Sequence, residues 1–396
     1  MQLNRCVVYV LVCILYCCQS NHNTAERFKM ITLDTREALK EADVSSFFEA
    51  DVDFVKLETT EENLVRADAP KAISEKYVWM GDNVTKQIYM FNRQGKFIRK
   101  IGNVGRGPGE YVDWSGFYYK EDSLYVHDRL QSKLLAYSVA DSGFYERKVS
   151  PAIYSSSVTG SSGYLYFITN YSNGFNLIRM NLKNGDQDYR LPYEPDIEKS
   201  NSFWGLNHYS ANYRDSVLFA LSRNDTIYQI YRDSCWPQYV VDFPVNKLPK
   251  QLLQKSGSEI LQTAFDKGFI CGIDRLYQSS CYIMGDFSEG RKAFLYLYDK
   301  ANGNTIVAES FVLASFGGLP LINPIVTDED EVLCYYDALL FKEFGRYMAE
   351  KKFFANESDR DKILRVLSSL SENENPVMVT MRLKKKIAVL KKISVF

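Results

Sequence analysis

The chain has 396 residues, of which 48 are Lys or Arg and 49 are Asp or Glu, so its formal net charge is −1. This balance excludes the strong basic field with which many proteins attract nucleic acid. Apolar residues make up 46% and aromatic residues 14% of the chain, which favours β-strands around a packed core and excludes extensive disorder.

The N-terminal segment is typical of an export signal. The apolar run from Cys6 to Tyr16 is too short to span a bilayer comfortably. Residues Leu15-Tyr16-Cys17-Cys18 resemble a bacterial lipobox in which Cys18 carries the lipid. Cys17 departs from the small residue expected at its position, so an ordinary secretory signal is the alternative. We predict a signal peptide over 1–17 and a lipid anchor at Cys18.

Cysteine usage agrees with export. Beyond the leader the chain carries Cys235, Cys271, Cys281 and Cys334. Cys271 and Cys281 lie in neighbouring strand-like runs, so a disulfide between them is one prediction and four ordinary buried cysteines are the other. The chain has no CxxC motif and no Cys/His cluster, which argues against a zinc site.

A degenerate repeat of paired strands around a turn runs along the chain. The first clear copy, Ile88–Ile101, turns at Asn92-Arg93-Gln94-Gly95. Early copies start about 43 to 50 residues apart, the period of a propeller blade with four strands. We therefore predict an all-β, six-bladed β-propeller over 51–396, preceded by a linker and lead-in over 18–50. The other copies are Leu134–Val149, Leu177–Leu191, Thr226–Phe243, Phe294–Phe311 and Val377–Leu383.

The two longest gaps between copies contain helix-like sequence. Apolar spacing predicts helices over Asn246–Phe265, with Gly257 weakening the middle, and within Asp337–Leu370. Ser358 followed by Asp361 resembles a capping box inside the second stretch. We expect both insertions to be structural and to lie against the flank or one mouth of the propeller.

Ring closure is predicted from a short early strand. Residues Asp53–Glu58 precede the first complete blade, and we expect them to pair with Val377–Leu383. The segment Lys384–Phe396 mixes lysines with apolar residues. We expect a solvated extension there, with a basic membrane-facing patch as the alternative.

Together these segments identify a resemblance. The residues that carry it are Ser45–Thr60, Gly95–Ile98, Gly107–Tyr111, Asn224–Tyr228 and Glu374–Val377. The chain resembles the six-bladed β-propeller lipoproteins of Bacteroidota, which are relatives of NHL-repeat and TolB-like propellers. The resemblance implies the fold, export, and association with glycan uptake or the cell envelope. It implies no catalytic residue.

The glycine-rich stretch Gly102–Tyr111 superficially resembles a phosphate-binding loop. A dinucleotide fingerprint requires a following helix, whereas strand-like sequence follows here and Pro108 interrupts the row of amides. We therefore predict a structural loop in which the glycines permit close packing between blades. Arg106 and Glu110 are expected near a mouth of the propeller and are candidate ligand-binding residues.

Aromatic residues in polar loops are candidates for stacking on sugar rings. The segment 201–209 is loop-like, polar and aromatic, which is typical of carbohydrate sites. Trp204 and Tyr209 are the ligand-binding candidates there. Trp79 is expected in the core.

Catalytic signals are weak. Only His127 and His208 lie beyond the leader region, so the body cannot supply three histidine ligands to a metal. No cofactor is predicted, although the acidic run Asp328–Glu331 leaves calcium as an alternative. A pair of carboxylates for glycoside hydrolysis cannot be chosen from sequence, because its members can be far apart in the chain.

These observations favour a non-catalytic, lipid-anchored protein of the outer membrane, facing the periplasm or the cell surface. We expect a monomer that binds a glycan, a peptide or an envelope protein, and no nucleic acid. The alternative is a hydrolase or lyase acting on a polysaccharide or lactone. Buried channel carboxylates with raised pKa values would favour that alternative.

Overall fold

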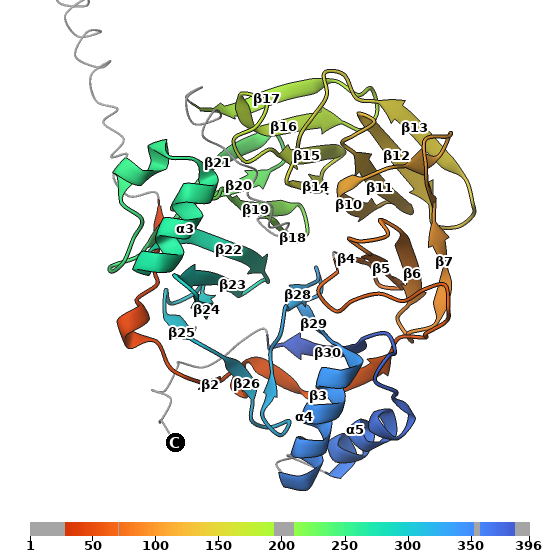
Figure 1. Cartoon of the computed structure of the whole chain (residues 1–396), viewed down its shortest axis with the longest axis vertical. Helices are drawn as coiled ribbons and strands as arrows, with labels where there is room; N and C mark the ends of the chain where they lie inside the picture. The colour runs from red at the N-terminus through yellow and green to blue at the C-terminus, as the bar shows by residue number, and fades with distance from the viewer. Residues whose placement is uncertain (1–27, 70, 194–209, 352–356, 385–396) are drawn as a thin grey trace, which may run out of the picture.

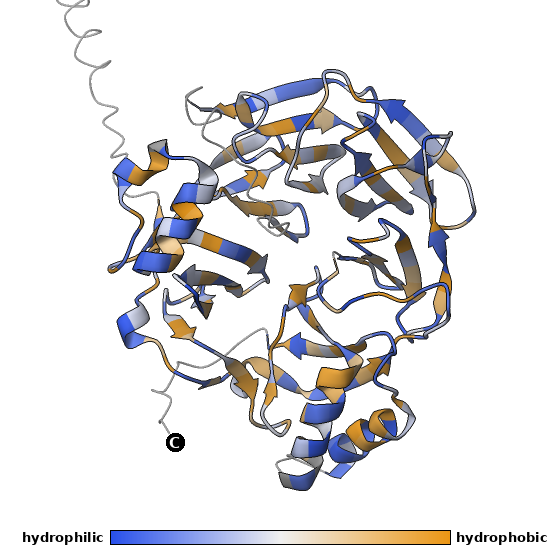
Figure 2. Ribbon diagram, viewed as in Figure 1, coloured by the Kyte–Doolittle hydropathy of each residue, from blue (hydrophilic) through white to orange (hydrophobic). Residues whose placement is uncertain are grey.

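The computed structural model describes residues 28–69, 71–193, 210–351 and 357–384. Strands dominate, and they form sheets arranged as a ring around a centre (Figure 1). Apolar and polar residues alternate along many of the strands (Figure 2), the pattern of sheets that pack face to face. The all-β propeller predicted from the repeat is therefore confirmed.

Three of the larger sheets come from the first half of the ring, and each is an antiparallel meander whose first strand lies innermost (Figure 1). The first sheet contains β4 Lys71–Ile73, β5 Tyr77–Gly81, β6 Ile88–Asn92 and β7 Phe97–Ile101. The second contains β10 Trp114–Lys120, β11 Ser123–Asp128, β12 Lys133–Ser138 and β13 Phe144–Lys148. The third contains β14 Ser157–Ser161, β15 Tyr164–Ile168, β16 Phe175–Asn181 and β17 Gln187–Pro192.

The other three larger sheets complete the ring. The fourth contains β18 Ser210–Tyr213, β19 Ser216–Ala220, β20 Thr226–Tyr231, β21 Ser234–Asp242 and the N-terminal β1 Lys29–Thr32. The fifth contains β22 Ile270–Gln278, β23 Tyr282–Glu289, β24 Lys292–Asp299 and β25 Thr305–Ala308. The sixth contains β28 Ile325–Val326, β29 Glu331–Tyr336, β30 Val377–Leu383 and β3 Phe48–Lys56.

A further sheet has three short strands, β2 Ala42–Asp43, β26 Phe311–Leu313 and β27 Leu319–Pro320. In the described residues, sheets of three or more strands therefore number seven, and the predicted count of six is too low. Strands this short carry no alternation that sequence reading can detect, and β2 comes from outside the repeat. A two-stranded pair, β8 Asn103–Val104 and β9 Glu110–Tyr111, lies in the glycine-rich stretch.

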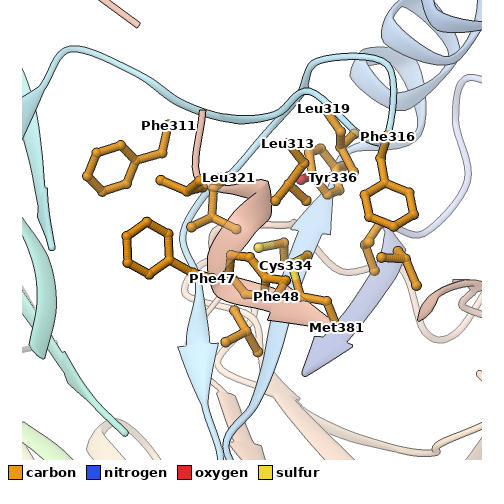
Figure 3. Packing of buried hydrophobic residues seen from close by; sticks show 14 of the residues in the cluster. Phe47, Phe48, Phe311, Leu313, Phe316, Leu319, Leu321, Cys334, Tyr336 and Met381 are labelled. Atoms are coloured by element: carbon orange, nitrogen blue, oxygen red, sulfur yellow. The ribbon is translucent and has the colours of Figure 1, made fainter. Parts of the chain in front are cut away.

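The predicted ring closure is confirmed. β3 pairs with β30 in antiparallel register, with Val52 opposite Met381 and Lys56 opposite Val377. The segment assigned to a lead-in also contributes structure, because β1 runs parallel to β21 and β2 runs parallel to β26. Phe47 and Phe48 pack with Phe311, Leu321 and further apolar side chains in one cluster (Figure 3), which joins the N-terminal segment to the last sheet.

Both predicted insertions contain helices. The first has the 3-10 helix η3 Lys250–Gln254 and then α3 Gly257–Lys267, which starts at a capping box made by Ser256 and Glu259. Gly257 thus begins a helix and does not weaken one. The second has α4 Ala338–Lys351 and α5 Glu357–Ser369, so Ser358 lies inside α5 and is not its cap. Two 3-10 turns, η1 Thr35–Glu37 and η2 Ser45–Phe47, complete the helices.

The α4–α5 pair covers the flank of the ring. α5 packs against β3, the outermost strand of the sixth sheet (Figure 1). Lys362 of α5 donates to the carbonyl of Val52 at 3.0 Å and pairs with Asp51 at 2.7 Å. Covering an edge strand in this way prevents pairing with another chain. None of the helices in the described residues is long and apolar enough to cross a membrane.

Candidate functional site

The ring has two unlike faces. In each sheet, the chain enters the inner strand from the same face of the ring. This face carries the connections between successive sheets, and also the connections between the second and third strands of each sheet. Most of the connections between sheets, such as 149–156, are long, so we call this the long-connection face; 82–87 and 129–132 are connections within a sheet on the same face. In the part of the chain that the structure describes, the connections on the opposite face are short turns, such as 121–122 and 162–163, and we call it the short-turn face.

Exposed apolar side chains distinguish the two faces. Val84 is 81% exposed, Leu130 64% and Tyr154 52%, and all three lie in connections of the long-connection face. Leu64, 56% exposed, lies in another. Among the residues described, no turn of the short-turn face carries an exposed large apolar side chain. Exposed apolar side chains that gather on one face are typical of a surface that meets a partner.

Val84, Leu130 and Tyr154 lie in segments that meet at the start of β10. The nearly buried carboxylate of Asp113 pairs with Lys86 at 3.0 Å and with Arg129 at 2.6 Å, which joins the first sheet to the second. Val84 is two residues from Lys86, and Leu130 follows Arg129. We call Val84, Leu130, Tyr154 and the Lys86–Asp113–Arg129 cluster the β10 mouth.

A buried polar cluster lies directly behind this mouth. Ser115 Oγ is 2.9 Å from His127 Nδ1 and 2.8 Å from Ser155 Oγ, and all three side chains are buried. Phe167 meets the imidazole edge-on, with ring centres 4.8 Å apart. His127 Nε2 has no hydrogen-bond partner in the described part of the chain. Burial lowers the pKa of His127 to about 4, so the ring is neutral at pH 7.

A serine beside a histidine is also the arrangement of a nucleophile and its base. Here Ser115 is only 5% exposed and His127 and Ser155 are fully buried, so substrate has no access to the hydroxyls. The cluster joins the second sheet to the connection that enters the third. We interpret it as structural support for the β10 mouth.

Ionisable groups gather on the fifth sheet. Arg275 of β22 lies 3.3 Å from Asp286 of β23 and also donates to Asn323. Burial raises the pKa of Asp286 to about 6, against the opposing effect of Arg275. Burial also raises the pKa of Asp274, whose carboxylate accepts from Ser288 at 2.7 Å. Raised carboxyl pKa values are typical of acid–base sites, and sequence reading did not find these residues.

The space beside Asp286 is small. A largely enclosed cavity of about 10 Å³ adjoins it, which is room for a single water and not for a sugar ring. Its lining residues are Tyr277, Met284, Gly285, Asp286, Leu295, Tyr296, Phe311, Leu321 and Pro324. The cavity beside Asp286 is therefore too small to hold a substrate.

Lys71, at the start of β4, is a second buried ionisable group. Its ammonium donates to the carbonyls of Ala67 at 2.7 Å and Ala69 at 2.6 Å and lies 4.5 Å from the ring centre of Tyr335. Burial lowers its pKa to about 7. These contacts fasten the connection before β4 to the sixth sheet, which accounts for the lysine structurally.

The glycine-rich stretch forms the structural loop predicted, in the connection between the first and second sheets. Glu110 accepts from the amide of Gly107 at 2.7 Å, and Gly109 donates to Glu146 of β13 at 3.0 Å. The loop thus packs on the outer strands of the second sheet, and the carbonyl of Gly105 accepts from Gln131, the neighbour of Leu130, at 3.2 Å. As a connection between the first and second sheets, it belongs to the long-connection face. Arg106 is exposed there, and Glu110 is occupied in holding the loop.

Two of these glycines are required by close contacts. Gly102 has φ +59°, and a Cβ there would lie 2.4 Å from the hydroxyl of Tyr137. Gly109 has φ +68°, and a Cβ would lie 2.7 Å from the ring of Phe144. Packing therefore explains both glycines without a ligand.

Other predicted residues have mixed outcomes. Trp204, Tyr209 and Cys18 lie outside the described residues. Trp79 is fully buried, as expected. None of the cysteines at 235, 271, 281 and 334 is in a disulfide.

The acidic run lies in the turn between β28 and β29. Asp330 accepts from the amide and the hydroxyl of Ser280, at 2.6 and 2.7 Å, and Asp328 accepts from the amide of Arg214 at 2.5 Å. The run thus joins the sixth sheet to the fourth and fifth on the short-turn face. The described segments contain no group of three His, Cys, Asp or Glu side chains able to hold a metal.

Comparison with known proteins agrees with this architecture. A crystal structure of a "Putative exported protein" from Bacteroides fragilis is 20% identical, with a TM-score of 0.70 over 90% of this chain and 100% of that chain. A DUF4221 family member from Bacteroides vulgatus is 9% identical, with a TM-score of 0.48 over 85% of this chain and 97% of that chain. At 20% identity, the likeness to the Bacteroides fragilis protein shows the fold alone.

A third similar structure is the extracellular domain of a one-component system protein from B. thetaiotaomicron. It is 11% identical, with a TM-score of 0.40, and the match covers 72% of this chain and 32% of that chain. No curated protein matches the sequence. The family model described as "Domain of unknown function (DUF4934)" matches residues 29–382. That match spans most of the chain, and the chain therefore belongs to the DUF4934 family.

Proposed function

We propose that this protein is a lipid-anchored, non-catalytic binding protein of the cell envelope that holds a peptide or protein partner at the β10 mouth. The leader ending at Cys18 supports export and anchoring, and the likeness to an exported Bacteroides protein agrees with it. The observation that carries the binding proposal is the exposure of Val84, Leu130 and Tyr154 in connections that meet at the start of β10.

The chemistry of the mouth favours a peptide or protein over a glycan. Val84 and Leu130 are aliphatic, and sugar rings are recognised mainly by aromatic faces and hydrogen bonds. An apolar centre beside a charged rim is the ordinary composition of a protein interface. A glycan platform at Trp204 and Tyr209 stays a prediction and is tested alongside.

Changing the β10 mouth should weaken binding of a peptide partner. Peptides selected by phage display on soluble 21–396 should bind a Leu130→Asp variant at least about tenfold more weakly, because a charge replaces an apolar contact. The measurement is fluorescence anisotropy with the selected peptides. Lys183→Glu on the short-turn face is the control and should leave affinity unchanged. Peptides that bind both variants equally would place the site elsewhere, and thermal shifts with a polysaccharide panel would then favour a glycan.

A second candidate, a hydrolase or lyase, is favoured by the raised pKa values of Asp274 and Asp286. The small cavity beside Asp286 argues against it. If the candidate is right, soluble 21–396 releases product from a polysaccharide or lactone panel, and Asp286→Asn lowers the rate by a factor of about 100 or more. Reducing-sugar and pH-stat assays measure this, with Asp141→Asn as the control. We expect no turnover from either protein.

A further inference from the structure

A buried hydroxyl group without a hydrogen-bond partner among the described residues belongs to a residue that lines the small cavity of the fifth sheet. Tyr296 of β24 is fully buried, and its hydroxyl has no hydrogen-bond partner in the described part of the protein. Leaving a buried hydroxyl unpaired is costly, and native proteins usually pair such groups with protein or with ordered water. The same cavity is lined by Asp286.

Gly285 leaves room for the Tyr296 hydroxyl. A Cβ at this position would lie 2.6 Å from the Tyr296 hydroxyl, so only glycine lets the hydroxyl reach over the strand. The cavity of about 10 Å³ is the size of one water and is too small for an organic ligand. A buried water needs polar partners, and Tyr296 and Asp286 are both among the residues that line this space.

We propose that this cavity is a binding site for one ordered water, which accepts a hydrogen bond from the Tyr296 hydroxyl and donates one to the Asp286 carboxylate. The water pairs the otherwise isolated hydroxyl and links β24 to β23 beside Arg275. A monovalent cation is the less suitable occupant, because Arg275 lies 3.3 Å from Asp286 and already balances its charge. This site is independent of the binding function proposed above.

Two tyrosine variants test the proposal by the sign of their effect. If the water is present, Tyr296→Phe removes a satisfied hydrogen bond and lowers the melting temperature. If the hydroxyl is unsatisfied, the same change raises it. Tyr335→Phe is the matched control, because Tyr335 is also buried with an unpartnered hydroxyl among the described residues and does not line the cavity. We expect its melting temperature to stay the same or to rise.

A crystal structure at high resolution supplies the direct measurement. Density for one water within hydrogen-bonding distance of both Tyr296 Oη and Asp286 supports the site. An empty cavity, or a higher melting temperature for Tyr296→Phe, overturns it. Melting is also measured in NaCl, KCl and choline chloride at equal ionic strength. A stabilisation specific to Na⁺ or K⁺ that Asp286→Asn abolishes would show a cation in place of water.

Discussion

Replacing Gly95 by alanine is expected to lower the free energy of unfolding by about 3 kcal/mol, through backbone strain and steric conflict together. Gly95 has φ +83°, and a Cβ there would lie 2.3 Å from the carbonyl oxygen of Lys56 at the end of β3. The amide of Glu58 donates to the Gly95 carbonyl at 2.7 Å. The change therefore acts where the ring-closing strand leaves the sixth sheet and meets the first.

Gly163→Ala is the matched control for this effect. Gly163 has φ +80°, and no atom lies within 4 Å of the Cβ position, so the variant incurs only the conformational cost of about 1–2 kcal/mol. Urea unfolding followed by circular dichroism compares the two variants with the parent protein. Equal losses of unfolding free energy in the two variants would show that the steric conflict between the alanine Cβ and the Lys56 carbonyl adds nothing to the backbone strain.

Acid is expected to destabilise the protein through His127. The unfolded histidine titrates near its ordinary pKa of about 6.5, whereas burial lowers the pKa of the folded residue to about 4. The unfolded state therefore binds the proton first. Stability from this residue is fully present above about pH 6.5 and decreases as the pH falls toward 4. The loss over this interval is about 3 kcal/mol.

His127→Gln tests this pH dependence, because the amide retains hydrogen-bonding capacity toward Ser115 and Ser155 without titrating. Unfolding free energies measured at intervals from pH 8 to pH 4 should fall less steeply for the variant than for the parent. A parent slope in the His127→Gln variant would assign acid sensitivity to other groups. The NMR titration of His127 in the parent protein measures its pKa directly.

Local sequence patterns were sufficient for the main architecture. The turn at Gly95 and the alternation in Ile88–Ile101 specify a hairpin because both depend on neighbours in the chain. The pairing of β3 with β30 was also predictable, because a ring of meanders leaves one early strand available to complete the last sheet.

The candidate site was less accessible to sequence reading. Arg106 and Glu110 were expected near a mouth, and their loop is a connection of the long-connection face, but Glu110 is occupied in holding the loop through the amide of Gly107. Asp113 and the exposed Val84 and Leu130 carry no motif. Their only sequence signal is that aliphatic residues occupy polar turns, which is uninformative until the turns are known to share a face.

By itself, the sequence determined the repeated hairpins, the helical insertions and the propeller class, because each is a pattern within a short stretch of chain. Tertiary structure alone decided that β1 joins the fourth sheet as its fifth strand. It also decided the small seventh sheet, the β10 mouth and the environment of Asp286. These features join residues from distant parts of the chain. Burial and charge pairing depend on which distant side chains the fold brings together, and no local spacing encodes that.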